Sequence, residues 1–255
     1  TSALAGRQGA RLADLQVQTS SYGTQVPALF GTMRVAGTVI WATDLQETSS
    51  RSGGGKGRPS VTSYSYSASI AVALSSRPVR AIRRIWADGN LLRGAAGDFK
   101  TEVGAFRVHP GDEGQSPDPL IASAQGIGAT PAHRGMAYVV FEDLALADYG
   151  NRIPSLTFEV EADDGAVPLD RIASDLSAGR LAGPAQISVG GFAASGADMR
   201  EAVMPLVSAY GLGLRSGVGD LALVDTGAAA GAISHDMRAQ RINGRAIDAV
   251  EHSGG

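Results

Sequence analysis

The chain has 255 residues, enough for one large domain or two ordinary ones, and its 44% hydrophobic and 18% charged residues are typical of a globular protein. The net charge of −3 gives no overall basic excess for binding nucleic acid, and the absence of cysteine excludes disulfides, thiolate metal sites and cysteine nucleophiles. No apolar run approaches the roughly 20 residues of a membrane-spanning helix, so no membrane span is expected. The 34 glycines and few aromatic residues favour a β-rich protein with many turns.

The first part of the chain combines polar, glycine-rich stretches with short apolar runs. Residues 1–12 are expected to form a flexible N-terminal arm, and the chain, which lacks an initiator Met, is interpreted as a fragment of a longer protein. Extended segments follow around Pro27 and over 35–41, where Gly37 interrupts the apolar run. A polar loop is expected over 46–60.

The clearest predicted strand is TSYSYSASIAVAL, residues 62–74. Tyr64, Ile70 and Leu74 belong to one alternating face, and strict alternation over this length indicates a strand with one face buried. The other face carries only serine and alanine, which leaves room for another backbone or subunit to lie close.

Several local signals define the elements that follow. Asp88-Gly89 predicts a tight hairpin turn. Asp118 is expected to cap a short helix that ends at Gly126, with Pro119 in its first turn. The remaining predicted strands of this part are 106–108, 136–142 and 155–162.

The character of the sequence changes near 163–165, where a domain boundary is predicted. Two helices, 168–178 and 197–210, and a strand near 187–189 are expected after it, and Pro205 is expected to bend or divide the second helix. A hairpin across 212–223 completes this part. The predicted organisation is therefore a β-rich domain over 13–165, an α+β domain over 166–226, and an incomplete C-terminal segment over 227–255.

The run RSGGGKGRPS, residues 51–60, has the glycines and lysine of a phosphate-binding loop but not its pattern. Such a loop needs Ser or Thr after the lysine and a helix behind it, whereas Lys56 is followed by Gly57 and then by the strand over 62–74. The run is interpreted as a solvated flexible loop. Its basic residues remain available to an acidic neighbour or a nucleic-acid backbone.

Candidate catalytic and metal-binding residues are sparse, and none is assigned. The histidines stand at no metal-binding spacing and are expected at the surface; they are His109, His133, His235 and His252. The carboxylate pairs 112–113, 142–143 and 163–164 are interpreted as solvated turn residues. If the chain were a hydrolase, Glu142 and Asp148 would be the weak candidates for its acid–base pair. Arg83-Arg84 is interpreted as an element that forms ion pairs at an interface, and no cofactor is expected.

The segment SSYGTQVPALFGTMRVAGTVIWATDLQE (20–47) resembles the tail-tip or baseplate hub proteins of long-tailed phages. The resemblance continues through TSYSYSASIAVAL (62–74) and MAYVVFEDLALADYGNRIPSLTFEV (136–160). This second half is especially similar to the hub region of the large baseplate protein of gene transfer agents and related prophages. The resemblance covers about 20–225.

This resemblance implies a mainly β fold with a tail-tube-like β-barrel hub domain and a small α+β domain. It also implies a structural role in a virion, assembled in the bacterial cytoplasm. The implied partners are copies of the chain in a homotrimeric ring, the tail tube and distal tail proteins, and the spike or fibre, with transient passage of DNA. Gly31 and Gly37 are then expected to supply a positive φ or a bulge where a barrel strand bends.

Two other functions remain open from the residues alone. One is an accessory part of a cell-wall hydrolase, and the other is a glycan- or receptor-binding module at the tail tip. Serine-faced strands and short charged loops without a catalytic set favour a subunit that packs against copies of itself.

Overall fold

A computed structural model describes residues 25–52, 61–216 and 221–226, together with the backbone of three two-residue strands: β1 (Arg7–Gln8), β17 (Arg241–Ile242) and β18 (Arg245–Ala246). Most of the expected arm and C-terminal segment therefore lies outside the described residues. The described chain divides into two compact units. The first runs to Val167 and includes Val189–Ser195, and the second contains Pro168–Ser188 and the described residues from Gly196 onward.

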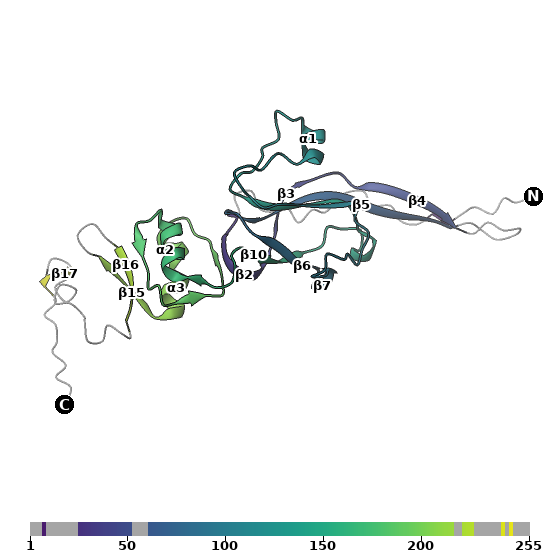
Figure 1. Cartoon of the computed structure of the whole chain (residues 1–255). Helices are drawn as coiled ribbons and strands as arrows, with labels where there is room; N and C mark the ends of the chain where they lie inside the picture. The colour runs from purple at the N-terminus through teal and green to yellow at the C-terminus, as the bar shows by residue number, and fades with distance from the viewer. Residues whose placement is uncertain are drawn as a thin grey trace, which may run out of the picture. The chain divides into compact units, whose positions relative to one another are not determined.

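Six strands of the first unit form a sheet around one long strand, β5 (Val61–Ser75) (Figure 1). On one side β5 pairs with β3 and β4, and on the other with β9, which in turn pairs with β8. All of these pairs are antiparallel, and β1 runs parallel to the start of β5. The bounds of these neighbours are β3 (Thr38–Ala42), β4 (Gln46–Ser52), β8 (Ala105–His109) and β9 (Ala137–Ala145).

The strand predicted over 62–74 is confirmed as β5, but its small-residue face is not open. Ile70 and Leu74 lie in the main core as the alternation predicts. Ala71 and Ala73 on the opposite face are buried against Ile121 and other apolar side chains of the same unit. The small side chains of Ala71 and Ala73 therefore leave room for other residues of the same chain. The second half of β5 is buried on both faces as a result.

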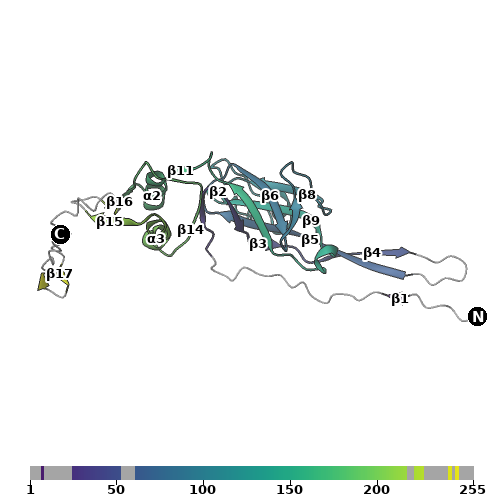
Figure 2. The same cartoon turned by 90° about the horizontal axis from the view of Figure 1, so that it is seen from below.

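The expectation of a loop over 46–60 is wrong for its first half, because residues 46–52 form strand β4. Residues 46–52 are all polar, so they show no alternation of apolar side chains from which a strand could be predicted. Thr is nevertheless common in strands, and polar side chains suit an exposed two-stranded ribbon. The register pairs Gln46 with Ser67 and Ser52 with Val61. Figures 1 and 2 show β4 and the first half of β5 extending away from β3, β8 and β9. Residues 53–60 lie outside the described residues.

A second, five-stranded sheet completes the first unit. Its order is β14 (Gly191–Ala194), β2 (Ala28–Ala36), β10 (Leu156–Glu161), β6 (Ala81–Ala87) and β7 (Asn90–Arg93). The predicted hairpin is confirmed, with both turn residues at positive φ, +48° for Asp88 and +84° for Gly89. The predicted α+β part, 166–226, is continuous in sequence, whereas Val189–Ser195 cluster with the first unit because β14 pairs with β2.

The main core includes buried apolar side chains from both sheets, among them Leu29, Val72, Phe141 and Phe158. The mainly β fold class is confirmed. Within the described part of the chain the strands form open sheets, and they do not close into one barrel. Two further elements lie in connections: helix α1 (Pro119–Gln125) between β8 and β9, and the 3-10 helix η1 (Ala147–Tyr149) between β9 and β10.

Gly37 lies where the chain leaves the five-stranded sheet at the end of β2 and enters the six-stranded sheet as β3. A Cβ at this position would lie 2.7 Å from Cε2 of Phe158 and would overlap the side chain of Val72. Gly37 is not among the glycines with positive φ, whereas Gly31 has a φ of +69°. The expected backbone role is therefore confirmed for Gly31, while Gly37 is needed because two core side chains occupy the space.

The two sheets are also tied together by a largely buried ion pair. Arg77, just after β5, donates to both carboxylate oxygens of Asp163, just after β10, at 2.8 and 3.2 Å. Asp163 also accepts from the amide of Gly31 at 2.9 Å, and Arg77 donates to the carbonyl of Leu29 at 2.6 Å. The guanidinium carbon lies 4.3 Å from the ring centre of Phe30. Three chain segments thus meet at one pair of charges.

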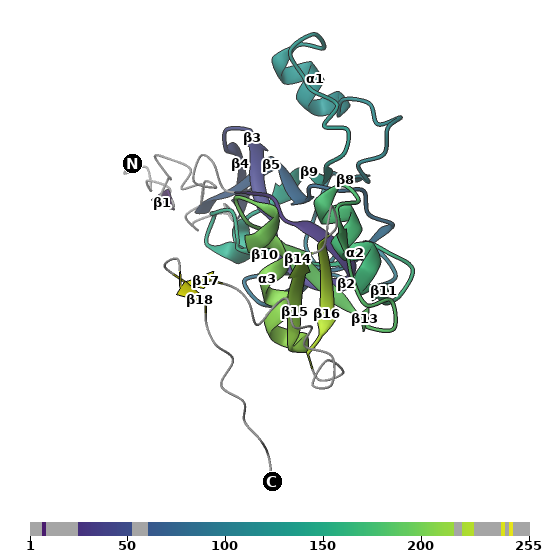
Figure 3. The ribbon, with the colours of Figure 1, turned by 90° about the vertical axis from the view of Figure 1, so that its left-hand side faces the viewer.

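The second unit combines a three-stranded sheet with two helices (Figure 3). The sheet order is β12 (Leu181–Ala182), β16 (Leu221–Asp225) and β15 (Leu212–Ser216). Helix α2 (Leu169–Ser177) contacts β12, and helix α3 (Met199–Tyr210) contacts α2 and β15. Short strands β11 (Val167–Pro168) and β13 (Ser188–Val189) pair where the chain passes between units.

Helix α3 is a single helix across Pro205, so the expected division does not occur. Pro205 lies on the exposed side of the helix. The first turn is fixed by a reciprocal cap, in which Asp198 accepts from the amide of Glu201 and Glu201 accepts from the amide of Ala197. Among the described helices, none has the length and apolar character needed to cross a membrane.

Replacing Gly37 by valine is expected to destabilise the protein by about 3 kcal/mol or more, because the added carbons must displace Val72 and Phe158 from a packed core. Urea denaturation of the 255-residue chain measures the change. The matched control is Gly128→Val, since no atom lies within 4 Å of a Cβ there. Equal stability of the two variants would contradict the role assigned to Gly37.

Arg77→Met is expected to lower the free energy of unfolding by about 3 kcal/mol, because the largely buried Asp163 loses the charge and the two hydrogen bonds of this guanidinium. The comparison is Arg83→Met, which removes an ion pair with Glu161 from a side chain that is 52% exposed and should cost at most about 1 kcal/mol. Chemical denaturation of both variants at neutral pH separates them. A cost for Arg77→Met no larger than for Arg83→Met would show that the pair does not tie the sheets.

Candidate functional site

The strongest cluster of ionisable side chains lies at the base of the connection between β8 and β9. Arg107 and His109 alternate on one face of β8, opposite Val140 and Tyr138 of β9 in the sheet register. Asp118 stands at the start of α1 and completes the cluster. Strand periodicity therefore places the arginine and histidine together, and the helix cap supplies the carboxylate between them.

Asp118 is the centre of this cluster, and its side chain is fully buried. Its carboxylate accepts from Arg107 Nε at 2.7 Å, and it hydrogen-bonds His109 Nε2 at 2.9 Å. It also accepts from the amides of Leu120 and Ile121, which confirms the predicted N-cap. Burial acts to raise the pKa of Asp118, but the hydrogen bonds from Arg107, His109 and the Ile121 amide outweigh it and hold the pKa below its usual value.

Arg107 joins this carboxylate to a second one, since its Nη1 donates to Glu142 at 2.6 Å. The hydrogen bond to Asp118 is the main cause that raises the pKa of Arg107, so the guanidinium is charged. Glu142, one of the two hydrolase candidates, is therefore engaged in an ion pair. The other candidate, Asp148, lies in η1 and accepts from the hydroxyl of Thr101 at 3.3 Å.

His109 and His133 are half-buried, so the expected surface location holds only in part for them. The His109 ring stacks on Tyr138 with centroids 4.3 Å apart, and the His133 ring meets the same tyrosine edge-on at 5.3 Å. Burial, with a smaller contribution from His109, lowers the pKa of His133. Burial followed by the charge of Asp118 raises the pKa of Tyr138 to about 12. His235 and His252 lie outside the described residues.

Gln115 is a second buried polar anchor of the same connection. Its side-chain oxygen accepts from the amide of Gly111 at 2.6 Å, and its nitrogen donates to the carbonyls of Ala132 and His133 at 2.8 and 2.9 Å. The side chain thereby joins the first part of the connection, at Gly111, to its last part, at Ala132 and His133. Nothing in the polar run around Gln115 distinguishes it from a solvated loop residue, so this role could not be predicted from the residues nearby.

The expectation of solvated carboxylates is confirmed for the first pair, 112–113, while the members of the other two pairs lie in different environments. Asp112 and Glu113 are exposed. Glu142 turns to Arg107, while Asp143, at a φ of +50°, lines a different region of the surface. The third pair divides between the buried Asp163 and the exposed Asp164.

Arg83 and Arg84 form ion pairs within the chain, whereas pairing at an interface was expected. Arg84 Nε donates to Glu159 at 2.8 Å, and Arg83 Nε donates to Glu161 at the same distance. These pairs join β6 to β10 on the outer side of the five-stranded sheet.

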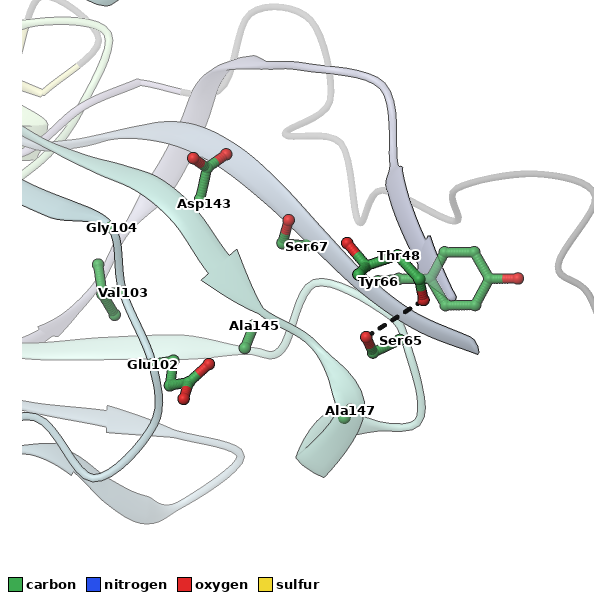
Figure 4. A pocket seen from close by; sticks show the side chains of 10 residues that line it. All are labelled: Thr48, Ser65, Tyr66, Ser67, Glu102, Val103, Gly104, Asp143, Ala145 and Ala147. Carbon is green, nitrogen blue, oxygen red and sulfur yellow. Dashed lines mark hydrogen bonds between the residues drawn. The ribbon is translucent and has the colours of Figure 1, made fainter. Parts of the chain in front are cut away.

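A pocket of about 650 Å³ lies beside β5 and β9, near the base of the β4–β5 ribbon (Figure 4). Its polar lining consists of hydroxyl groups and the carboxylates of Glu102 and Asp143, and none of its lining side chains is basic. The lining residues are Thr48, Ser65, Tyr66, Ser67, Glu102, Val103, Gly104, Asp143, Ala145 and Ala147.

These arrangements have the chemistry of structural anchors. A general acid requires a carboxyl whose pKa is raised, whereas that of Asp118 is lowered by its partners. Among the residues that the structure describes, no group of three or more His, Asp or Glu side chains is placed to hold a metal ion.

The chain matches no protein-family model and no curated protein. It is similar to a chain in a solved structure titled "Virion of native gene transfer agent (GTA) particle", with 30% sequence identity and a TM-score of 0.61. The match covers 85% of this chain and 55% of that chain, so this chain spans about half the length of its structural neighbour.

Asp118→Asn is expected to lower the free energy of unfolding by about 2 kcal/mol at pH 7, because an amide retains the helix cap but loses the charged hydrogen bonds to Arg107. Because the pKa of Asp118 is lowered by folding, its stabilisation is present above the unfolded value of about 3.9 and is lost as the pH falls through the lower folded value. The difference in the free energy of unfolding between wild type and variant should therefore become smaller in acid.

Urea denaturation at several pH values measures this gap. Asp112→Asn, at an exposed position of the same connection, is the control. A constant gap between pH 7 and pH 2 would contradict the assignment of the stabilisation to the charge of Asp118.

Proposed function

We propose that the chain is a structural subunit of the baseplate or tail-tip hub of a phage-type particle, where the tail tube joins the central spike or fibre. The observation that carries this proposal is the 30% identity to a chain of a gene transfer agent virion over 85% of the present chain. The resemblance of residues 20–47 and 136–160 to hub proteins supports the more specific position. In this proposal the protein is part of the particle and is assembled in the bacterial cytoplasm.

The proposed partners are copies of this chain in a trimeric ring, the tail tube with its distal proteins, and the spike or fibre. Such a subunit must present its surfaces in fixed positions. Two features of the first unit support this requirement: the Arg77–Asp163 pair, which ties its sheets, and the buried anchors Gln115 and Asp118, which fix its longest described connection.

A position along the DNA path is compatible with the charges of the chain. A wall that DNA must pass cannot hold the phosphate backbone strongly, and strong retention comes from unpaired Lys and Arg. Arg83 and Arg84 on the five-stranded sheet are both paired with glutamates, and the chain has a net charge of −3. Paired charges of this kind favour passage of DNA over its retention.

We infer a structural and not a catalytic role for the ionisable cluster. Asp118 and Glu142 share the guanidinium of Arg107, so both carboxylates serve to hold the connection between β8 and β9 on the sheet. The two functions left open by the sequence, a hydrolase part and a glycan-binding module, gain no specific support from this geometry.

Mass spectrometry of purified tailed particles from the source cell tests the proposal. Peptides from residues 28–194 should be present in the particles at a constant ratio to the tail-tube protein that corresponds to three copies per tail. A major capsid protein and a cytoplasmic enzyme serve as positive and negative controls. Absence of the peptides from particles that contain the tail tube would overturn the proposal.

A further inference from the structure

Two histidines from different parts of the chain contact the same buried tyrosine. Tyr138 of β9 is fully buried, with His109 of β8 stacked on its ring and His133 edge-on to it. His133 belongs to the connection between β8 and β9, residues 110–136. The phenol, with its pKa raised to about 12, is neutral, so the charge at this point depends on the two imidazoles.

The two histidines differ in their ionic partners. His109 Nε2 lies 2.9 Å from a carboxylate oxygen of Asp118, whose side chain is fully buried. Within the described part of the chain, no carboxylate lies within ion-pair distance of His133. A proton on His109 is therefore compensated by a neighbouring carboxylate, whereas a proton on His133 is not.

The other charges of the cluster do not supply this compensation. Arg107 on β8 donates to both carboxylates, at 2.7 Å to Asp118 and at 2.6 Å to Glu142 of β9. Arg134, which directly follows His133, adds a further positive charge to the same segment. A proton on His133 therefore adds positive charge to a region that already contains two arginines.

The segment that carries His133 is held by neutral hydrogen bonds. Residues 130–136 are named here the return segment. The carbonyl of His133 accepts from Gln115 Nε2 at 2.9 Å and from the amide of Met136 at 3.0 Å, and the amide of Gly135 donates to the carbonyl of Gly111 at 2.9 Å. In the sequence of this segment, His133 is the one group that titrates between about pH 4 and pH 8.

The direction of the pKa shift agrees with this geometry. Burial, followed by the charge of His109, lowers the pKa of His133 in the folded protein. Its stabilisation is therefore fully present above the unfolded value of about 6.5 and is lost as the pH falls below that value. The pKa of Asp118 is held below its usual value of about 3.9, so this carboxylate keeps its charge in mild acid.

We propose that mild acid releases the return segment from the sheet through a proton on His133, while the first part of the connection stays held at Asp118. The charged imidazole is better solvated by water than by the ring of Tyr138, so the segment moves away from the sheet. A proton on His109 has the opposite effect, because it forms an ion pair with Asp118. The inference concerns the chain by itself and is independent of the proposed function.

Hydrogen exchange of the 255-residue chain at pH 7.5 and pH 5.0 tests the inference, with exchange times scaled for the slower chemical exchange in acid. We expect the protection of the Gly135 and Met136 amides to fall at least about threefold in acid. The amide of Ile121, which donates to the Asp118 carboxylate, should keep its protection. An equal loss of protection in β5 would indicate general unfolding and would overturn the inference.

His133→Phe is the decisive variant, because phenylalanine keeps an aromatic ring against Tyr138 and takes up no proton. The protection of its return segment should be the same at both pH values, whatever its level at pH 7.5. His109→Phe is the matched control and should retain the loss in acid, because burial is the larger cause of the lowered pKa of His133. No loss in the wild type, or an equal loss in His133→Phe, would contradict the inference.

An NMR titration of the His133 imidazole in the wild-type chain gives an independent check. We expect its midpoint below the unfolded value of about 6.5. A midpoint at or above that value would show that folding does not disfavour the proton, and the inference would fail.

Discussion

The first unit depends on the ion pair between Arg77 and Asp163. Its partners lie 86 positions apart in the sequence, and each directly follows a strand of a different sheet. Gly31 brings a third strand to the same carboxylate through its amide. Because both charges are largely buried, either one alone would be costly, so the geometry that pairs them is favoured over other packings of the two sheets. Gly37 provides the complementary constraint, since it allows the chain to change sheets through the packed core.

Elements with a strong local signal were predicted correctly. The alternation over 62–74 defined β5, Asp88-Gly89 defined a hairpin turn, and Asp118 with Gly126 defined the bounds of α1. In each case the determining interactions lie within a few residues, such as a positive φ in a turn or a side chain that accepts from amides two and three residues ahead. The mainly β class follows from the same signals.

What the sequence did not reveal depends on partners that are distant along the chain. Strand β4 exists because β5 pairs with it, and its own polar residues give no alternation of apolar side chains. The environment of His109 depends on the register of β8 and β9, which places it on Tyr138, and on the helix cap, which brings Asp118 within hydrogen-bond distance of its ring. Glu142 was considered as a catalytic carboxylate because its sequence neighbourhood cannot show that Arg107 binds it. The contacts of His109 and Glu142 are therefore set by the sheet register and cannot be predicted from the residues next to each of them in the sequence.

The continuity of β5 also has a mechanical consequence. Its first half pairs with β4 in the projecting ribbon, while its second half is buried between β3 and β9, so one uninterrupted backbone of about 50 Å joins the two regions. A pull along the ribbon is carried directly into the centre of the six-stranded sheet. There it loads the hydrogen bonds to both neighbouring strands in shear, all at once and not one after another. Force applied to the ribbon therefore reaches the interior of the unit along one continuous strand.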